Sequence, residues 1–227
     1  MENIIKDNIK HSWRDVTINE YFKLREKIEE ATSDYEKEII KIAFIYGLEE
    51  DDIWNKRISD VKNMQRNTSW LSDISISKDV KFKKILIDDV LYDVNADMQS
   101  FTVAQYIDFQ TFFPKRVQKI NYIGNILACF ITPKNHKYGE GYDVQELVKK
   151  INENVDIKTA NEMIFFFLKR YLHSIKVMHI FFNWQMKILK MLKMKKHKAK
   201  IEKLEKMVKE MEENISAGLP LLTMYQN

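Results

Sequence analysis

The stretch SDYEKEIIKIAFIYGLEEDDIW, residues 33–54, contains the start and end of one helix and the start of the next. Ser33 or Asp34 begins the first of these helices, which runs through EIIKIAFIY. Gly47 supplies the left-handed residue on which helices often end. The four carboxylates of residues 49–52 suit the positive N-terminal end of a short helix that carries Ile53 and Trp54. This stretch predicts a helical fold class.

The preceding residues extend the same pattern. Thr17 caps a helix in TINE, where Glu20 reaches back to the Thr17 amide, and apolar residues then recur at helical spacing. A further capped turn is expected at Ser59. Residues 1–75 are therefore expected to form a helical N-terminal unit.

Composition supports a mainly helical chain. Only 5 glycines and 3 prolines interrupt 227 residues, of which 45% are hydrophobic, so long helices are favoured over a turn-rich β architecture. The net charge of +4 makes neither a histone-like nor a strongly acidic surface. The single cysteine, Cys129, lies in an apolar run, which predicts a buried thiol and a reducing cytoplasm. The first residues lack the apolar core of a signal peptide.

Residues 76–98 change character. VKFKKILI (80–87) alternates partly with period two, Asp88 and Asp89 offer a turn, and VLYDV (90–94) resumes the apolar pattern. These features predict a β-hairpin. An isolated hairpin is only marginally stable in water, so this hairpin is expected either to pack on the helices of its own chain or to pair with another chain. Packing on its own helices is favoured.

Residues 99–155 are expected to form a second helical unit. Thr102 and Gln105 make a capping box, and Pro114 is expected to end that helix. KRVQKINYIGNILACFI (115–131) predicts the next helix, PKNHKYGEGYD (133–143) a loop, and Asp143 with Glu146 the cap of another helix.

Residues 156–227 lack proline and glycine as far as Gly218, which predicts one long, protruding C-terminal helix, broken once near Asn183. Apolar residues follow one another at spacings of three, four, three and four, as in a short coiled-coil seam. This predicted protein-interaction site consists of Ile201, Leu204, Val208, Met211 and Ile215. So short a seam needs a partner chain.

Lysines concentrate just before this seam. Eight lysines and a single acid lie between Lys187 and Lys203. Those expected to contact phosphates or an acidic protein surface are Lys190, Lys193, Lys196, Lys200 and Lys203. Non-specific nucleic-acid binding is the alternative function that these residues support, although arginine and a recognition fold are absent from the run.

Other chemistries find no support in the sequence. The apolar segment 164–184 carries Lys169, Arg170 and Lys176, each costly in a bilayer, so an amphipathic helix is favoured over a membrane span. The histidines are scattered without zinc spacing, and the acids of residues 49–52 are read as helix-start residues. We expect no catalytic residues, metal site or cofactor, and no enzyme activity.

Several segments together resemble phage proteins. W-x-D-V-T-I-N-E-Y-F (13–22), EIIKIAFIYGLEEDDIWNKRISDVKNM (38–64) and SWL (69–71) resemble the N-terminal unit of bacteriophage tail assembly chaperones. TVAQYIDFQTFF (102–113), KYGEGYD (137–143) and EMIFFFLKRY (162–171) are similar to virion-assembly proteins of phages that infect Bacteroides-type gut bacteria. The long C-terminal helix departs from the chaperone pattern and suits an interlocking virion subunit.

The resemblance implies a non-enzymatic morphogenesis protein that acts by protein–protein contact. We expect a tail-assembly chaperone or a ring-forming subunit of the tail or head-to-tail connector. The expected partners are other tail or connector proteins and further copies of this chain. The expected location is the host cytoplasm during assembly or the virion itself, and no membrane contact is expected.

Overall fold

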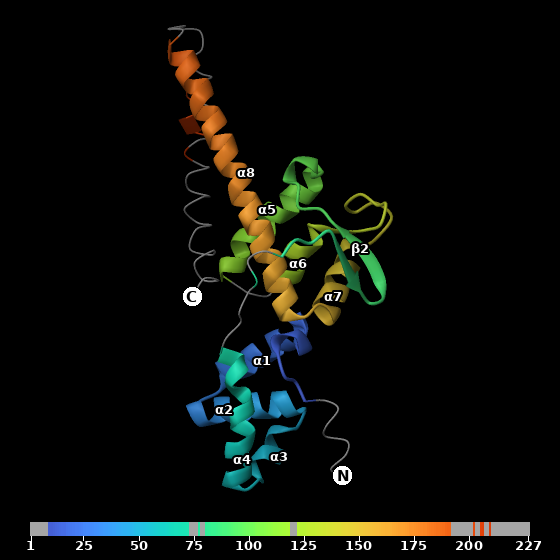
Figure 1. Ribbon diagram of the computed structural model, residues 1–227, viewed down its shortest axis with the longest axis vertical. Helices are drawn as coiled ribbons and strands as arrows, with labels where there is room; N and C mark the ends of the chain where they lie inside the picture. The colour runs from blue at the N-terminus through green and yellow to red at the C-terminus, as the bar shows by residue number, and fades with distance from the viewer. Residues whose placement is uncertain are drawn as a thin grey trace. The chain divides into compact units, whose positions relative to one another are not determined.

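The computed structural model describes residues 9–72, 77, 80–118 and 122–191, together with residues 202, 205, 206 and 209. Eight α-helices and three β-strands lie within this part of the chain (Figure 1). The α-helices are α1 (Ile18–Glu30), α2 (Asp34–Tyr46), α3 (Glu50–Trp54), α4 (Ile58–Gln65), α5 (Val103–Gln118), α6 (Ile123–Ala128), α7 (Val144–Asn154) and α8 (Ile157–Met191). The strands are β1 (Lys84–Ile87), β2 (Val90–Val94) and β3 (Ile131–Pro133). The predicted mainly α fold with a small β component is confirmed.

The chain divides into two compact units. The first combines Met1–Asn95 with Thr102–Met163 and so holds α1 to α7, the sheet and the beginning of α8. The second combines Ala96–Phe101 with Ile164–Asn227 and holds the 3₁₀ turn η4 (Met98–Ser100) and the rest of α8. Each unit is therefore built from two separate stretches of sequence.

Local caps set the ends of the first helices as predicted. The Thr17 hydroxyl accepts the Glu20 N–H (3.3 Å), and the Glu20 carboxylate accepts the Thr17 N–H (2.9 Å). Ser33 caps α2, and Gly47 ends it in the left-handed region at φ 61°. No side chain caps α4 and Ser59 lies inside that helix, so the expected cap at Ser59 is wrong.

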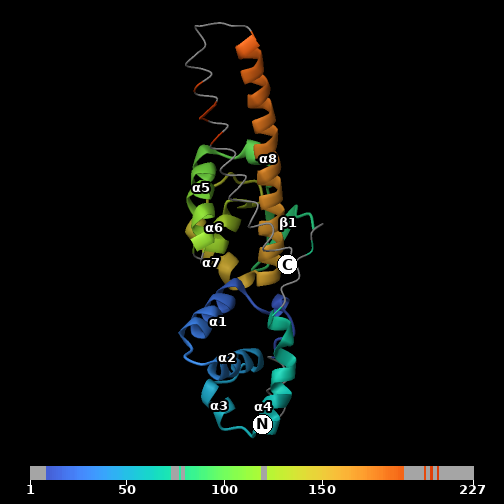
Figure 2. The same ribbon diagram turned by 90° about the vertical axis from the view of Figure 1, so that its left-hand side faces the viewer.

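Helix α2 is central to the N-terminal helices because it contacts α1, α3 and α4 (Figure 2). Its inner face supplies Ile39, Ile42 and Ala43, which are buried together with Ile53 of α3. Leu48 lies at the α2–α3 turn and packs against this cluster. The result is a small helical core held by apolar burial.

Backbone pairing joins the start of α1 to the junction of α7 and α8. The Ile18 N–H donates to the Val155 carbonyl (3.0 Å), and the Ile157 N–H donates to the Val16 carbonyl (2.8 Å). Val16, Ile18 and Ile157 are fully buried there. The N-terminal helices are thus tied to a segment about 140 residues away in sequence, a distance that local patterns do not cover.

The predicted hairpin is present and receives an additional strand. Strands β1 and β2 pair in antiparallel register through a turn at Asp88 and Asp89, both left-handed with φ 51° and 56°. These angles define a type I′ turn, whose twist matches a two-residue hairpin. Strand β3 pairs with the other side of β2 and completes a sheet of order β1-β2-β3.

Three expectations for the later helices are corrected. Helix α5 continues through Pro114 to Gln118, so the proline removes one backbone donor without ending the helix. The helix expected over residues 115–131 is divided, with α6 confined to Ile123–Ala128 and β3 following it. Helix α8 is continuous through Asn183, so the expected break is wrong.

The predicted cap at Asp143 is confirmed, since its carboxylate accepts the Gln145 N–H (2.8 Å).

Candidate protein-interaction site

A groove of about 280 Å³ lies between α1, α2 and the start of α3. Its floor is apolar, made chiefly by Leu24, Ile40 and Ala43, which are all nearly buried. Phe44 and Leu48 extend the apolar lining toward the rim. A cap fixes the start of α1 and Gly47 turns the chain from α2 into α3, so local signals set the walls and helix packing makes the space between them.

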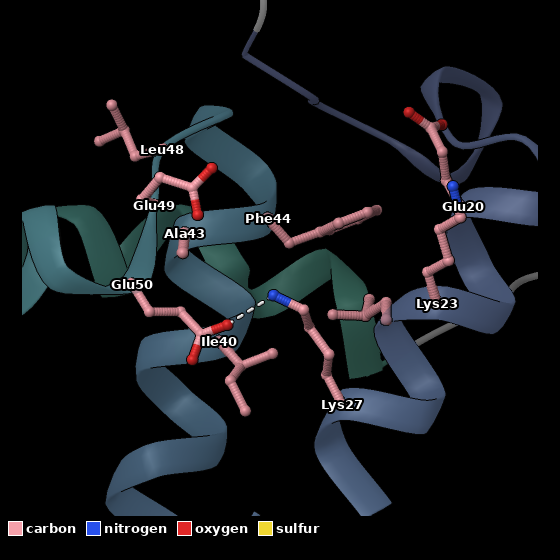
Figure 3. A pocket seen from close by; sticks show the side chains of 10 residues that line it. Glu20, Lys23, Lys27, Ile40, Ala43, Phe44, Leu48, Glu49 and Glu50 are labelled. Carbon is pink, nitrogen blue, oxygen red and sulfur yellow. Dashed lines mark hydrogen bonds and ion pairs between the residues drawn. The ribbon is translucent and has the colours of Figure 1, made fainter. Parts of the chain in front are cut away.

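Ion pairs mark two parts of the groove. At one, Lys27 Nζ of α1 reaches Glu50 Oε1 of α3 at 2.7 Å, as the dashed line in Figure 3 shows. At the other, Lys10 Nζ lies 2.9 Å from Glu20 Oε1 and 5.4 Å from the centre of the Phe44 ring. These side chains surround an apolar floor with charges of both signs.

One member of each ion pair, Lys27 or Glu20, has a shifted pKa. The hydrogen bond to Glu50 raises the pKa of Lys27, and burial opposes this shift only in part. Burial raises the pKa of Glu20, but the hydrogen bonds from Lys10 and Thr17 outweigh it and leave the pKa below its ordinary value. Lys27 and Glu20 are therefore charged at neutral pH.

Lys23 stands between these pairs on α1 and is exposed. Within the described residues it makes no ion pair. Lys23 and Lys27 are one turn apart, so both ammonium groups lie on one side of α1. Lys23 is thus available to a carboxylate of a docking protein.

The groove is close to the lower end of the size range of small-molecule sites. Sites for small molecules usually measure about 300–1,000 Å³ and surround most of the ligand. At about 280 Å³ this groove is just below that range, and charged side chains line it beside the apolar floor. The arrangement can receive apolar side chains of another protein.

Large apolar side chains also stand exposed elsewhere on the first unit. Tyr35 and Trp54 are each more than half exposed, with ring centres 5.3 Å apart. Two further sets lie on the hairpin and on the first turns of α5, and they are Leu86, Val90, Leu91, Val103, Tyr106 and Ile107. Aromatic side chains are enriched in protein interfaces, and contiguous exposed apolar patches often mark them.

The predicted interaction residues lie mostly beyond the described part of the chain. Lys190 falls in the last turn of α8. The others are outside the described residues, namely Lys193, Lys196, Lys200, Lys203 and the seam residues Ile201, Leu204, Val208, Met211 and Ile215. The seam and the lysine run stay predictions.

Cys129 is fully buried, as predicted. Burial raises its pKa to about 12, so the sulfur is a thiol at neutral pH and not a nucleophilic thiolate. The neighbouring Tyr138 hydroxyl donates to Asp108 Oδ2 (2.8 Å), and the Gln105 amide donates to the Cys129 carbonyl (2.6 Å). This cluster joins α5 to the residues after α6 by hydrogen bonds.

Sequence reasoning missed the groove because its residues are separated by up to 30 positions. A signal was present in α1, where Lys23 and Lys27 flank the apolar Leu24 at helical spacing. Which side of α2 faces these residues of α1 depends on how the two helices pack, and no local sequence pattern shows it. Among the described residues, no three or more histidine, cysteine, aspartate or glutamate side chains are grouped for metal binding.

No helix in the described part of the chain has both the length and the apolar character needed to cross a membrane. Comparison with known proteins finds no matching family model, curated protein or solved structure.

Proposed function

We propose that this chain acts without covalent chemistry, by protein–protein contact during bacteriophage tail or head-to-tail connector assembly. It acts as a tail-assembly chaperone or as a ring-forming subunit that stays in the particle. It works in the host cytoplasm during assembly, and as a subunit it remains in the virion.

The observation that supports this proposal most is the exposure of large apolar side chains on several elements of the first unit. Trp54 is 53% exposed beside Tyr35, and Leu86 is 62% exposed on the hairpin. Side chains of this size cost free energy in water, about 25 cal/mol for each Å² of apolar surface, which a partner recovers by covering them. Contact with another protein is the direct way to cover them.

The lining of the groove indicates what kind of partner surface it would bind. We assign it to an amphipathic helix of a tail or connector protein, with apolar side chains over Leu24 and Ala43 and a carboxylate facing Lys23. Helices that dock in this way place apolar residues in a groove and charged residues at its rim. The resemblance of residues 13–22 and 38–64 to tail assembly chaperones supports the assignment, because these residues supply most of the groove walls.

Co-purification during infection tests the proposal. The tagged chain should retain a tail or connector protein, and Lys23→Glu should weaken retention about tenfold or more, since a like charge then faces the carboxylate of the partner. The matched control is Lys149→Glu on α7, which also reverses an exposed lysine but lies outside the groove. Equal retention by both variants would remove the groove from the interface, and capture of no phage structural protein would contradict the function.

Non-specific nucleic-acid binding through the lysine run is the second candidate, and the eight lysines between Lys187 and Lys203 favour it. Its signature is an affinity for DNA that falls steeply with salt and is independent of DNA sequence.

A further inference from the structure

Among the described residues, strand β1 is paired on one side only. It lies at the edge of the sheet, and β2 is its only neighbour among the described strands. Hydrogen-bonded pairs alternate along an antiparallel ladder. Here the type I′ turn makes Ile87 and Val90 the first such pair, and the Val94 N–H donates to the Lys83 carbonyl at 2.9 Å. The backbone groups of Lys84 and Leu86 therefore point away from β2.

The side chains at this edge are also exposed. Leu86 is 62% exposed and lies directly opposite Leu91, which is 45% exposed. Val90 is 46% exposed beside the turn. An edge strand with open backbone groups and exposed leucines is a template for pairing with another strand.

We propose that β1 pairs with β1 of a second copy of this chain. The two strands run antiparallel about a two-fold axis at Leu86, and the two sheets join into one sheet of six strands. This proposal deepens the self-association that belongs to the proposed function and names its surface. A two-fold contact closes at two copies, so a ring would need a further, head-to-tail surface.

Charge selects the register. When the axis passes through Leu86, Lys84 lies opposite Asp88 of the second copy, and Lys83 lies beside the same turn. An axis at Lys84 would place lysine opposite lysine, which is unfavourable in cross-strand pairs. An axis at Ile85 would place Lys84 opposite Leu86 of the second copy, so the lysine would face an apolar side chain and no carboxylate. The register centred on Leu86 therefore combines outward backbone pairing with complementary charges.

The same lysines explain why the contact is selective. Lysine on an edge strand discourages pairing with unrelated edges. In the two-fold register the lysines meet the carboxylates at the turn, so the strand accepts its own copy in preference to an apolar or basic strand. Both Lys84 and Asp88 are exposed, and neither makes an ion pair among the described residues.

Analytical ultracentrifugation of the full chain tests the proposal across the micromolar range. The wild-type chain should sediment as a concentration-dependent dimer. Leu86→Pro should weaken the dimer tenfold or more, because it removes a donor that points outward and leaves the β1–β2 ladder intact. Leu91→Thr on the neighbouring strand is the control and should retain the dimer. Circular dichroism checks that both variants fold.

A cysteine variant tests the register without weakening the strand. Leu86→Cys, treated with oxidised glutathione, should form a disulfide-linked dimer, since paired Cα atoms at such a position lie about 5.5 Å apart. Leu91→Cys should not, because its two copies lie roughly 14 Å apart across three strand spacings. Cys129 is buried and does not interfere.

A wild-type chain that stays monomeric at every concentration would overturn the proposal. Equal dimerisation of wild type and a folded Leu86→Pro variant, or faster crosslinking of Leu91→Cys than of Leu86→Cys, would overturn it as well. None of these results bears on whether the chain binds tail or connector proteins, so failure of this contact is distinguishable from failure of the proposed function.

Discussion

Single residues with several partners determine how the N-terminal helices begin. Glu20 closes the capping box of α1 and also pairs with Lys10 at 2.9 Å, so one carboxylate joins the helix start to the chain before it. Its pKa is lowered by these hydrogen bonds despite the opposing effect of burial. Such a group stabilises the fold at neutral pH and loses this contribution in acid.

Glu20→Gln tests this assignment. Glutamine keeps the capping hydrogen bond and removes the charge. The variant should have a lower free energy of unfolding at neutral pH. The free energy of unfolding of the wild type should fall as the pH drops from the ordinary glutamate pKa near 4.5 through the lower pKa of Glu20 in the folded protein. The free energy of unfolding of the variant should fall less steeply. Urea titrations at pH values from 7 down to about 3 measure both slopes. A fall for Glu20→Gln that is parallel to the fall of the wild type would contradict the assignment.

Gly124 allows α6 to approach α7 closely. A Cβ atom at this position would lie 2.3 Å from Asn152 Oδ1, which is buried without a hydrogen-bond partner among the described residues. Gly124→Ala should therefore cost about 1 kcal/mol or more of unfolding free energy. In an Asn152→Ala background the same change should stabilise by about 0.5–1 kcal/mol, since alanine is the better helix former once space exists.

Thermal unfolding of the wild type, both single variants and the double variant measures this coupling. The same effect of Gly124→Ala in both backgrounds would show that Asn152 does not limit the approach of the two helices.

At the scale of elements, helix ends were predictable and the sheet was predictable only in part. Thr17, Ser33 and Asp143 cap helices through contacts within three residues, and Gly47 ends α2 through its own backbone angle. Signals of this kind are complete in a short stretch of sequence. Strand β3 has only three residues, and its extended state depends on pairing with β2, about 40 residues earlier.

The division of residues 115–131 was missed for the same reason. Their apolar residues suit a helix as well as buried irregular chain, and the choice depends on packing. Phe130 lies beyond α6, and its carbonyl accepts the Asn95 N–H at 2.8 Å, a pairing that starts β3. The groove was missed because no single stretch contains both of its walls.

The C-terminal seam supplies the prediction for the last element. If residues 201–215 dock through apolar contacts, Leu204→Asp with Val208→Asp should abolish association, because both charges would be buried in the interface. Changing Lys193, Lys196 and Lys200 to glutamine should alter mainly the rate and salt dependence of encounter. Binding assays against the captured partner measure both sets of variants. Intact association with the seam changed, together with loss of tight DNA binding in the glutamine variant, would favour the nucleic-acid function.

At the scale of the whole molecule, the chain combines several surfaces suited to contact with other proteins. The groove has an apolar floor beside Lys23, which we propose receives a partner helix, and the hairpin edge exposes Leu86, which we propose meets a second copy. The one cysteine is buried with its pKa raised to about 12, which removes the thiol as a nucleophile. These features support a protein that assembles with others.

Quantitative mass spectrometry of particles purified from the phage that encodes this chain tests the central claim most directly. The account predicts that the chain is present in a fixed ratio to tail or connector proteins, or that it is missing from finished particles and bound to one of those proteins in the unassembled fraction. The first result identifies a virion subunit and the second a chaperone. A chain found neither in the particles nor on a tail or connector protein would contradict a role in assembly.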